Sequence, residues 1–92
     1  MTNTFMNDSY KLLKLMYDNQ ITVLNKSFVP LTQMELSSEL GFSKMKTNAL
    51  FVDLQSKEYI VKVARGKYAL SDKAIYIVDN IENIENTLEG WN

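Results

Sequence analysis

The chain of 92 residues contains neither cysteine nor histidine. Without cysteine it has no disulfide and no thiolate nucleophile, and without histidine it lacks the commonest general base and a frequent metal ligand. It also has no glycine-rich phosphate loop, and its carboxylates are scattered over positions that suit helix surfaces. We therefore expect a protein that is not an enzyme, with no catalytic residue, metal site or cofactor.

Proline and glycine are scarce as well, with one and three residues, while 46% of the chain is hydrophobic. This composition predicts one folded domain with a small core rather than a disordered chain. No apolar run approaches the length of a membrane span, and the first residues do not have the pattern of a signal peptide. We expect a cytoplasmic protein without a membrane partner.

Basic residues are concentrated in one part of the chain, although the net charge is only −1. Residues 43–73 contain seven bases and three acids, whereas residues 74–92 contain four acids and no base. Charge asymmetry along a chain indicates partners that the net charge does not reveal. The middle of the chain therefore favours an anionic partner.

The first half of the chain has local signals for two helices. Ser9 is a candidate cap for a helix through about Asp18, and residues 28–30 suggest a short extended segment because proline disfavours helix before it. Thr32 and Glu35 have the spacing of a capping box, which predicts a helix through Leu40. Its inward-facing residues are expected to be Met34, Leu36 and Leu40, and Gly41 is expected to end it.

The second half predicts a longer helix, a hairpin and a final helix. Ser43 is expected to cap a helix from Lys44 to about Lys57. Its core face is formed by Thr47, Leu50, Phe51 and Leu54. Residues 60–64 and 67–70 read as two strands joined by a turn at Arg65 and Gly66. Ser71 or Asp72 would then cap the last helix.

Two helices joined by a short glycine-containing turn, followed by a hairpin, form a helix-turn-helix with a wing. In this pattern the chain resembles the winged helix-turn-helix DNA-binding proteins, in particular MarR-like regulators and small plasmid or phage centromere-binding proteins. The matching residues are Leu31, Thr32, Glu35, Leu36, Glu39 to Lys44, Leu54, Tyr59, Ile60 and Gly66 to Lys73. The resemblance implies a mostly helical α+β fold, with a loose N-terminus (1–8), a winged-helix core (9–74) and a C-terminal helix (75–92).

One position departs from the family pattern. Glu58 stands where these families usually have a glycine, between the recognition helix and the wing. A longer or differently ended helix would tilt the wing and make its DNA contacts less secure. The chain is also shorter than typical MarR-like proteins and closer in size to the centromere-binding group.

The resemblance makes the helix from Lys44 the recognition helix, and its basic first turn then faces DNA phosphates. Asn48 can read adenine, Lys46 can reach guanine or phosphate, and Met45 or Ala49 can touch a thymine methyl. Arg65, at the hairpin turn, would contact the minor groove or the backbone. The predicted DNA-binding residues are Ser43, Lys44, Met45, Lys46, Asn48 and Ala49 on the helix and Lys62, Arg65, Gly66 and Lys67 on the wing.

Two of these patterns have simpler interpretations. Lysines at a helix start are often ordinary solvated surface, and Met45, Ala49 and Val52 form an apolar stripe that suits a protein partner. The second function to consider is therefore an interaction module that binds no DNA. Capped helices, a basic helix start, a basic hairpin and segregated charge together favour double-stranded DNA.

The last helix carries a strict 3,4-spaced apolar seam. Either this helix packs on its own domain, as its early part should, or its later part pairs with a second copy. We expect a homodimer with two recognition helices, acting as a transcriptional regulator or as a centromere- or origin-binding protein on nucleoid or plasmid DNA. The seam begins at Ala74, and its predicted dimerisation residues are Ile77, Ile81, Ile84, Leu88 and Trp91.

Overall fold

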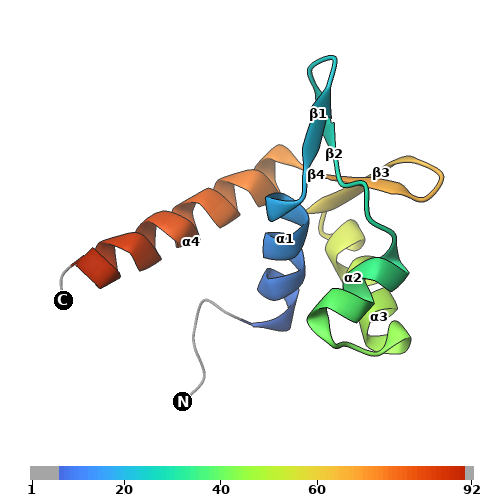
Figure 1. Ribbon diagram of the computed structural model, residues 1–92, viewed down its shortest axis with the longest axis horizontal. Helices are drawn as coiled ribbons and strands as arrows, with labels where there is room; N and C mark the ends of the chain where they lie inside the picture. The colour runs from blue at the N-terminus through green and yellow to red at the C-terminus, as the bar shows by residue number, and fades with distance from the viewer. Residues whose placement is uncertain (1–6, 91–92) are drawn as a thin grey trace.

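The computed structural model describes the backbone of residues 7–90 and the side chains of residues 7–83. The described chain is a mostly helical α+β domain with four helices and two β-hairpins (Figure 1). The helices are α1 (Asp8–Asp18), α2 (Gln33–Leu40), α3 (Lys44–Ser56) and α4 (Asp72–Gly90). The strands are β1 (Ile21–Val23), β2 (Lys26–Phe28), β3 (Ile60–Ala64) and β4 (Lys67–Leu70). None of the helices within residues 7–90 is long and apolar enough to cross a membrane.

The caps of α2 and α3 confirm the predicted boundaries. The Thr32 hydroxyl accepts a hydrogen bond from the Glu35 backbone N–H (3.1 Å), and the Glu35 carboxylate accepts one from the Thr32 N–H (2.9 Å). Gly41 ends α2 with φ 71°, a left-handed conformation that costs glycine little. Ser43 Oγ accepts from the Lys46 N–H at 3.0 Å. Residues 41–43 therefore form a tight turn between the two helices.

The starts of α1 and α4 depend on residues that the sequence left ambiguous. Asn7, and not the predicted Ser9, caps α1, because its Oδ1 accepts from the Tyr10 N–H at 2.8 Å. Asparagine is as good a cap as serine, so propensity alone could not choose between them. At α4 the Ser71 hydroxyl accepts from the Ala74 N–H at 3.2 Å, which makes Ser71 the cap.

The β1–β2 hairpin was not predicted. Leu24 and Asn25 connect its strands, and both have positive φ (51° and 67°), as in a type I′ turn. Leucine is rarely found in this conformation, so the sequence carried a weak turn signal. The predicted extended segment lies at the end of this hairpin, where the Val29 N–H donates to the Tyr68 carbonyl at 2.7 Å. This contact joins the projecting β1–β2 hairpin to β4 (Figure 1).

The β3–β4 hairpin has the predicted strands and turn. Ile60 pairs with Leu70 at its base, and Gly66 takes φ 71° at its tip. The register shifts between Lys62 and Ala64, a β-bulge that bends the outer part of β3. The base of the hairpin is buried and its outer part is exposed.

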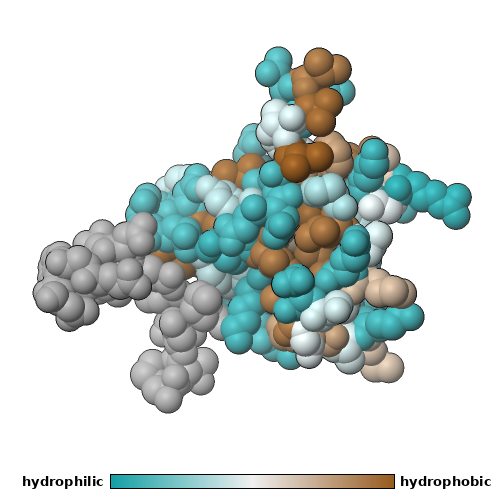
Figure 2. Space-filling view, in the orientation of Figure 1, coloured by the Kyte–Doolittle hydropathy of each residue, from teal (hydrophilic) through white to brown (hydrophobic). Residues whose placement is uncertain are grey.

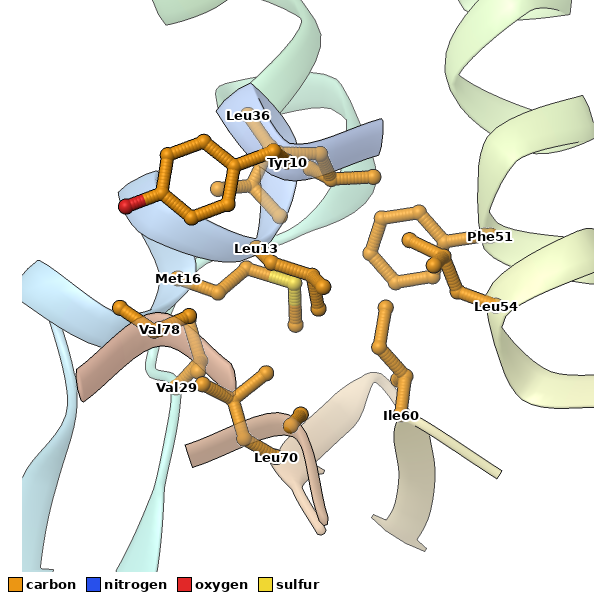
Figure 3. Close-up of a cluster of buried hydrophobic side chains, with 12 residues drawn as sticks. Tyr10, Leu13, Met16, Val29, Leu36, Phe51, Leu54, Ile60, Leu70 and Val78 are labelled. Carbon is orange, nitrogen blue, oxygen red and sulfur yellow. The ribbon is translucent and has the colours of Figure 1, made fainter. Parts of the chain in front are cut away.

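The core lies between the four helices and the bases of the two hairpins (Figure 3). Its fully buried large side chains include Leu12, Met16, Leu36 and Phe51, each stabilising the fold by about 1.5–3 kcal/mol. Thr47, Phe51 and Leu54 are buried as predicted, while Leu50 and Leu40 are half-buried at the edge of the core. The prediction for Met34 was wrong, since its side chain is 62% exposed.

Glu58 does not lengthen α3. The helix ends at Ser56, and Glu58 adopts φ 64°, the left-handed conformation that a glycine would take. The Glu58 N–H donates to the Gln55 carbonyl (3.0 Å) and the Tyr59 N–H to the Leu54 carbonyl (2.9 Å), the two hydrogen bonds of a Schellman motif. The expectation of a differently ended helix was therefore wrong.

Candidate nucleic-acid interface

The first turns of α2 and α3 and the tip of the β3–β4 hairpin border one hollow of ≈ 670 Å³. It is lined by Thr32, Gln33, Met34, Ser37, Lys44, Met45, Asn48, Gly66 and Tyr68. We call this hollow, together with the exposed stripe of α3 beside it, the candidate interface. The hollow brings the predicted helix residues Lys44, Met45 and Asn48 to the same place as Gly66 of the predicted wing.

The exposed stripe of α3 runs along the side opposite its core residues. Met45, Asn48, Ala49 and Val52 follow each other at steps of three, one and three residues, so that they share one face of the helix. All four are exposed, Met45 by 83% and Val52 by 58%. Figure 2 shows hydrophobic and hydrophilic side chains interspersed over this part of the molecule. The stripe combines one amide with three apolar side chains.

Tyr68 sets the spacing between α3 and the hairpin tip. Its ring meets the Phe51 ring edge-on, with centroids 4.9 Å apart and planes at 69°. Its hydroxyl oxygen accepts a hydrogen bond from Gln33 Nε2 at 3.5 Å, a long contact. Because Phe51 is fully buried, this aromatic contact ties one wall of the hollow to the core.

Lys46 is directed away from the hollow. Its Nζ lies 2.6 Å from Asp8 Oδ2 on α1 and 4.2 Å from the centroid of the Phe42 ring. The hydrogen bond from Lys46 holds the pKa of Asp8 below its ordinary value of 3.8. A lowered carboxylate pKa stabilises the fold at pH above about 3.8, and this contribution is lost as the pH falls through the lowered pKa. Lys46 thus connects α1 to α3, apart from the other predicted helix residues.

The basic residues of the β3–β4 hairpin differ in their surroundings. Lys62 and Arg65 are exposed and have no ion pair or ring contact with any residue in the described part of the chain, and the same holds for Lys44 at the start of α3. Lys67 Nζ instead lies 5.2 Å from the centroid of the Phe28 ring. Lys44, Lys62 and Arg65 are therefore the uncompensated cations of this region, as far as residues 7–83 are concerned.

Two further basic residues, Lys57 and Lys73, lie at the C-terminal end of α3. Lys57 Nζ lies 3.2 Å from Asp53 Oδ2, one helical turn earlier. Lys73 Nζ donates to the Lys57 carbonyl at 2.6 Å and lies 4.5 Å from the centroid of the Tyr59 ring. A cation at the C-terminal end of a helix is favourable because the helix dipole is negative there. Part of the positive charge of residues 43–73 therefore stabilises the fold itself.

The residues of the predicted dimerisation seam lie in different environments in the structure. Ala74 and Val78 are fully buried in the core, and Val78 was missing from the predicted seam. Ile77 and Ile81 are half-buried, and both border a smaller hollow of ≈ 280 Å³ beside α1. The side chains of Ile84 and Leu88, and the whole of Trp91, lie outside the described residues. The backbone of α4 continues to Gly90 and extends away from the rest of the domain (Figure 1).

The acids in the first part of α4 contact α1. Tyr17 donates a hydrogen bond to Asp79, which raises the pKa of the Tyr17 phenol above its ordinary value of 10.0. Lys14 Nζ lies 2.8 Å from Asp18 and 3.6 Å from Glu82, and the hydrogen bond to Asp18 is the main reason that its pKa is raised. The contacts that raise these two pKa values stabilise the fold below about pH 10, and their contribution is lost at higher pH. Acids of α4 thus hold the helix against α1.

The sequence-based prediction missed three residues that line the hollow: Gln33 and Met34 at the start of α2, and Tyr68 on β4. One signal was available, because Met34 is an apolar residue two positions before Leu36, a spacing that places it on a different side of the helix. No group of histidine, cysteine, aspartate or glutamate side chains among residues 7–83 has the arrangement of a metal site. Comparison of the chain with protein families, curated proteins and solved structures finds no match. The functional argument therefore depends on the residues themselves.

Proposed function

We propose that this protein is a winged helix-turn-helix protein that binds double-stranded DNA, with α3 as its recognition helix and the β3–β4 hairpin as its wing. One observation carries the proposal. The start of α3, its exposed stripe and the hairpin tip border a single hollow, and the uncompensated cations Lys44 and Arg65 belong to the helix start and the hairpin tip. This arrangement suits a duplex, whose phosphates flank the base edges that a helix reads.

The start of α3 supports a phosphate contact. Its first turn contains no acidic residue, so no carboxylate of the helix itself offsets the positive end of the helix dipole. A DNA phosphate would supply the missing negative charge through the free backbone N–H groups and the Lys44 ammonium. Lys46 contributes mainly to the packing of α1 on α3, because Asp8 already neutralises it.

We further propose that the protein acts as a homodimer joined through the outer part of α4, and that it regulates transcription. The backbone of α4 extends beyond the domain, and this part is the one that we propose to pair with the same helix of a second copy (Figure 1). A two-fold dimer presents two recognition helices to two half-sites. A centromere- or origin-binding protein would use the same surface on repeated tandem sites, so footprinting of the bound DNA separates the two roles.

A second function is favoured by the exposure of Met45 and Val52. Apolar side chains of this kind on one helix face also suit a groove on another protein. An interaction module would not need the uncompensated cations, and its binding would depend little on salt. Salt dependence of duplex binding therefore separates the two functions.

The test is titration of the full-length chain with random-sequence DNA duplexes over a range of salt concentrations. We expect binding that weakens steeply with salt, and the Lys44→Gln and Arg65→Gln variants should each lower the slope by about one phosphate contact. Lys57→Gln is the matched control, because Lys57 is paired with Asp53 at the far end of α3. Absence of salt-dependent duplex binding, or equal losses in all three variants, would overturn the proposal.

A further inference from the structure

The base-reading part of α3 lacks the groups that prefer guanine. Guanine is read most often by arginine or lysine in a bidentate contact. The only arginine of the chain is Arg65, which lies on the hairpin, and Lys46 is occupied by Asp8. Lys44 is the first residue of α3, beside the free N–H groups, where a phosphate is its natural partner. The exposed stripe itself contains no cation.

The groups that the stripe does contain suit adenine and thymine. The Asn48 amide can bond adenine N6 and N7 together, and apolar side chains can contact the thymine 5-methyl group. Met45 and Val52 are largely exposed, and Ala49 lies between them on the same face. None of the three has a packing role in the described domain that would explain an apolar side chain at its position. Contact with thymine methyl groups would remove this apolar surface from water.

The hairpin tip is compatible with the same preference. Arg65 is exposed beside Gly66, which borders the hollow together with Met45 and Asn48. Runs of adenine·thymine pairs narrow the minor groove and concentrate negative potential there, which attracts an inserted arginine. Because the stripe and the tip border one hollow, their contacts would fall on neighbouring segments of one duplex.

We propose that the DNA site of this protein is rich in adenine·thymine pairs, read by Asn48, Met45 and Val52 in the major groove and by Arg65 in the adjacent minor groove. This inference rests on the DNA-binding function proposed above and names the chemistry of its target. It identifies thymine methyl groups and adenine N7 as the recognised atoms.

The first experiment selects the tightest duplex from a random pool with the full-length chain. We expect an adenine·thymine-rich site. Replacing thymine by deoxyuridine, which removes only the methyl group, should weaken binding several-fold, and replacing adenine by 7-deazaadenine should do the same. Asn48→Ala should lose on the order of tenfold on the selected site and much less on an unrelated duplex.

Two valines provide a matched comparison. Val52→Ala should bind thymine and deoxyuridine duplexes more equally than the parent does, because it removes one of the groups that contacts the methyl. Val23→Ala is the control, since Val23 has a similar exposure (52%, against 58% for Val52) but lies on the β1–β2 hairpin, away from α3 (Figure 1).

A third experiment tests the contact of Arg65 at the tip of the β3–β4 hairpin. Inosine in place of guanine removes the minor-groove amino group of the DNA. This replacement should raise the affinity of the parent protein for the duplex but not the affinity of Arg65→Gln.

The outcomes separate this inference from the function on which it rests. A selected site with guanine·cytosine pairs beneath α3, or equal affinity for thymine and deoxyuridine duplexes, would overturn the inference while DNA binding stands. Absence of any salt-dependent duplex binding would instead overturn the proposed function.

Discussion

Thr47 combines full burial with an unused hydroxyl group. It lies on the core side of α3, as its spacing from Phe51 predicts, and its Oγ1 has no hydrogen-bond partner among the described residues. A buried hydroxyl without a partner loses its hydrogen bonds to water and receives nothing in return. This position therefore lowers the stability of the fold.

Thr47→Val should raise the free energy of unfolding by about 1 kcal/mol, because valine has the same shape without the polar atom. Urea denaturation of the two proteins measures the difference through the shift in midpoint at constant slope. Thr47→Ser is the control: it keeps the hydroxyl and deletes the methyl group, so it should be less stable than the parent. A valine variant that is less stable than the parent would show that the hydroxyl is satisfied.

At the scale of elements, the end of α3 determines where the β3–β4 hairpin begins. Glu58 holds a left-handed conformation there without being a glycine, and Tyr59 then continues directly into Ile60 of β3. A residue with a Cβ pays roughly 1–2 kcal/mol for this conformation. The two Schellman hydrogen bonds maintain it against that cost.

Glu58→Gly should raise the free energy of unfolding by about 0.5–1 kcal/mol, since glycine removes the strain but also gains freedom in the unfolded chain. Glu58→Ala is the matched control, because it removes the charge and keeps the strain, and it should bring no such gain. DNA affinity should be unchanged in Glu58→Gly, because the backbone already has the conformation of a glycine. A glycine variant no more stable than the alanine variant would contradict this account of the turn.

At the scale of the whole molecule, α4 has two parts with different roles. Its first part packs on the core through Ala74 and Val78 and is held to α1 by Asp79 and Glu82. Its second part extends from the domain and continues the predicted seam. Ile81 lies at the boundary and is half-buried, so a charge there would disturb both the core and a dimer.

Leu88→Glu should convert the proposed dimer into a folded monomer and weaken binding to the selected site by about a hundredfold or more. The glutamates of two paired helices would be forced together in an apolar interface, and loss of pairing removes the high local concentration of the second half-site. Sedimentation at micromolar concentration and circular dichroism measure assembly and folding separately. Tyr76→Glu is the control, since Tyr76 is an exposed residue on the first part of α4. A monomeric parent protein would overturn the proposed dimer.

The sequence alone determined the features that depend on neighbouring residues. The capping box of Thr32 and Glu35, the stop at Gly41 and the cap at Ser43 are closed by hydrogen bonds over three to five residues. Both partners of each hydrogen bond lie close together in the sequence. The sequence alone therefore predicts where these helices begin and end. The same holds for the two strands and the turn of the β3–β4 hairpin.

Only the tertiary structure decided which faces and charges remain free. Lys46 and Lys44 look equivalent in the sequence, but Asp8 of a distant helix neutralises one of them. Val78 takes a core position that the seam did not predict, because the packing of α4 on α1 and β4 selects the buried face. The hollow exists only because Tyr68 packs on Phe51 and brings the hairpin tip to the start of α3. Long-range packing has no local signature, so the shape of the candidate interface was not readable from the sequence.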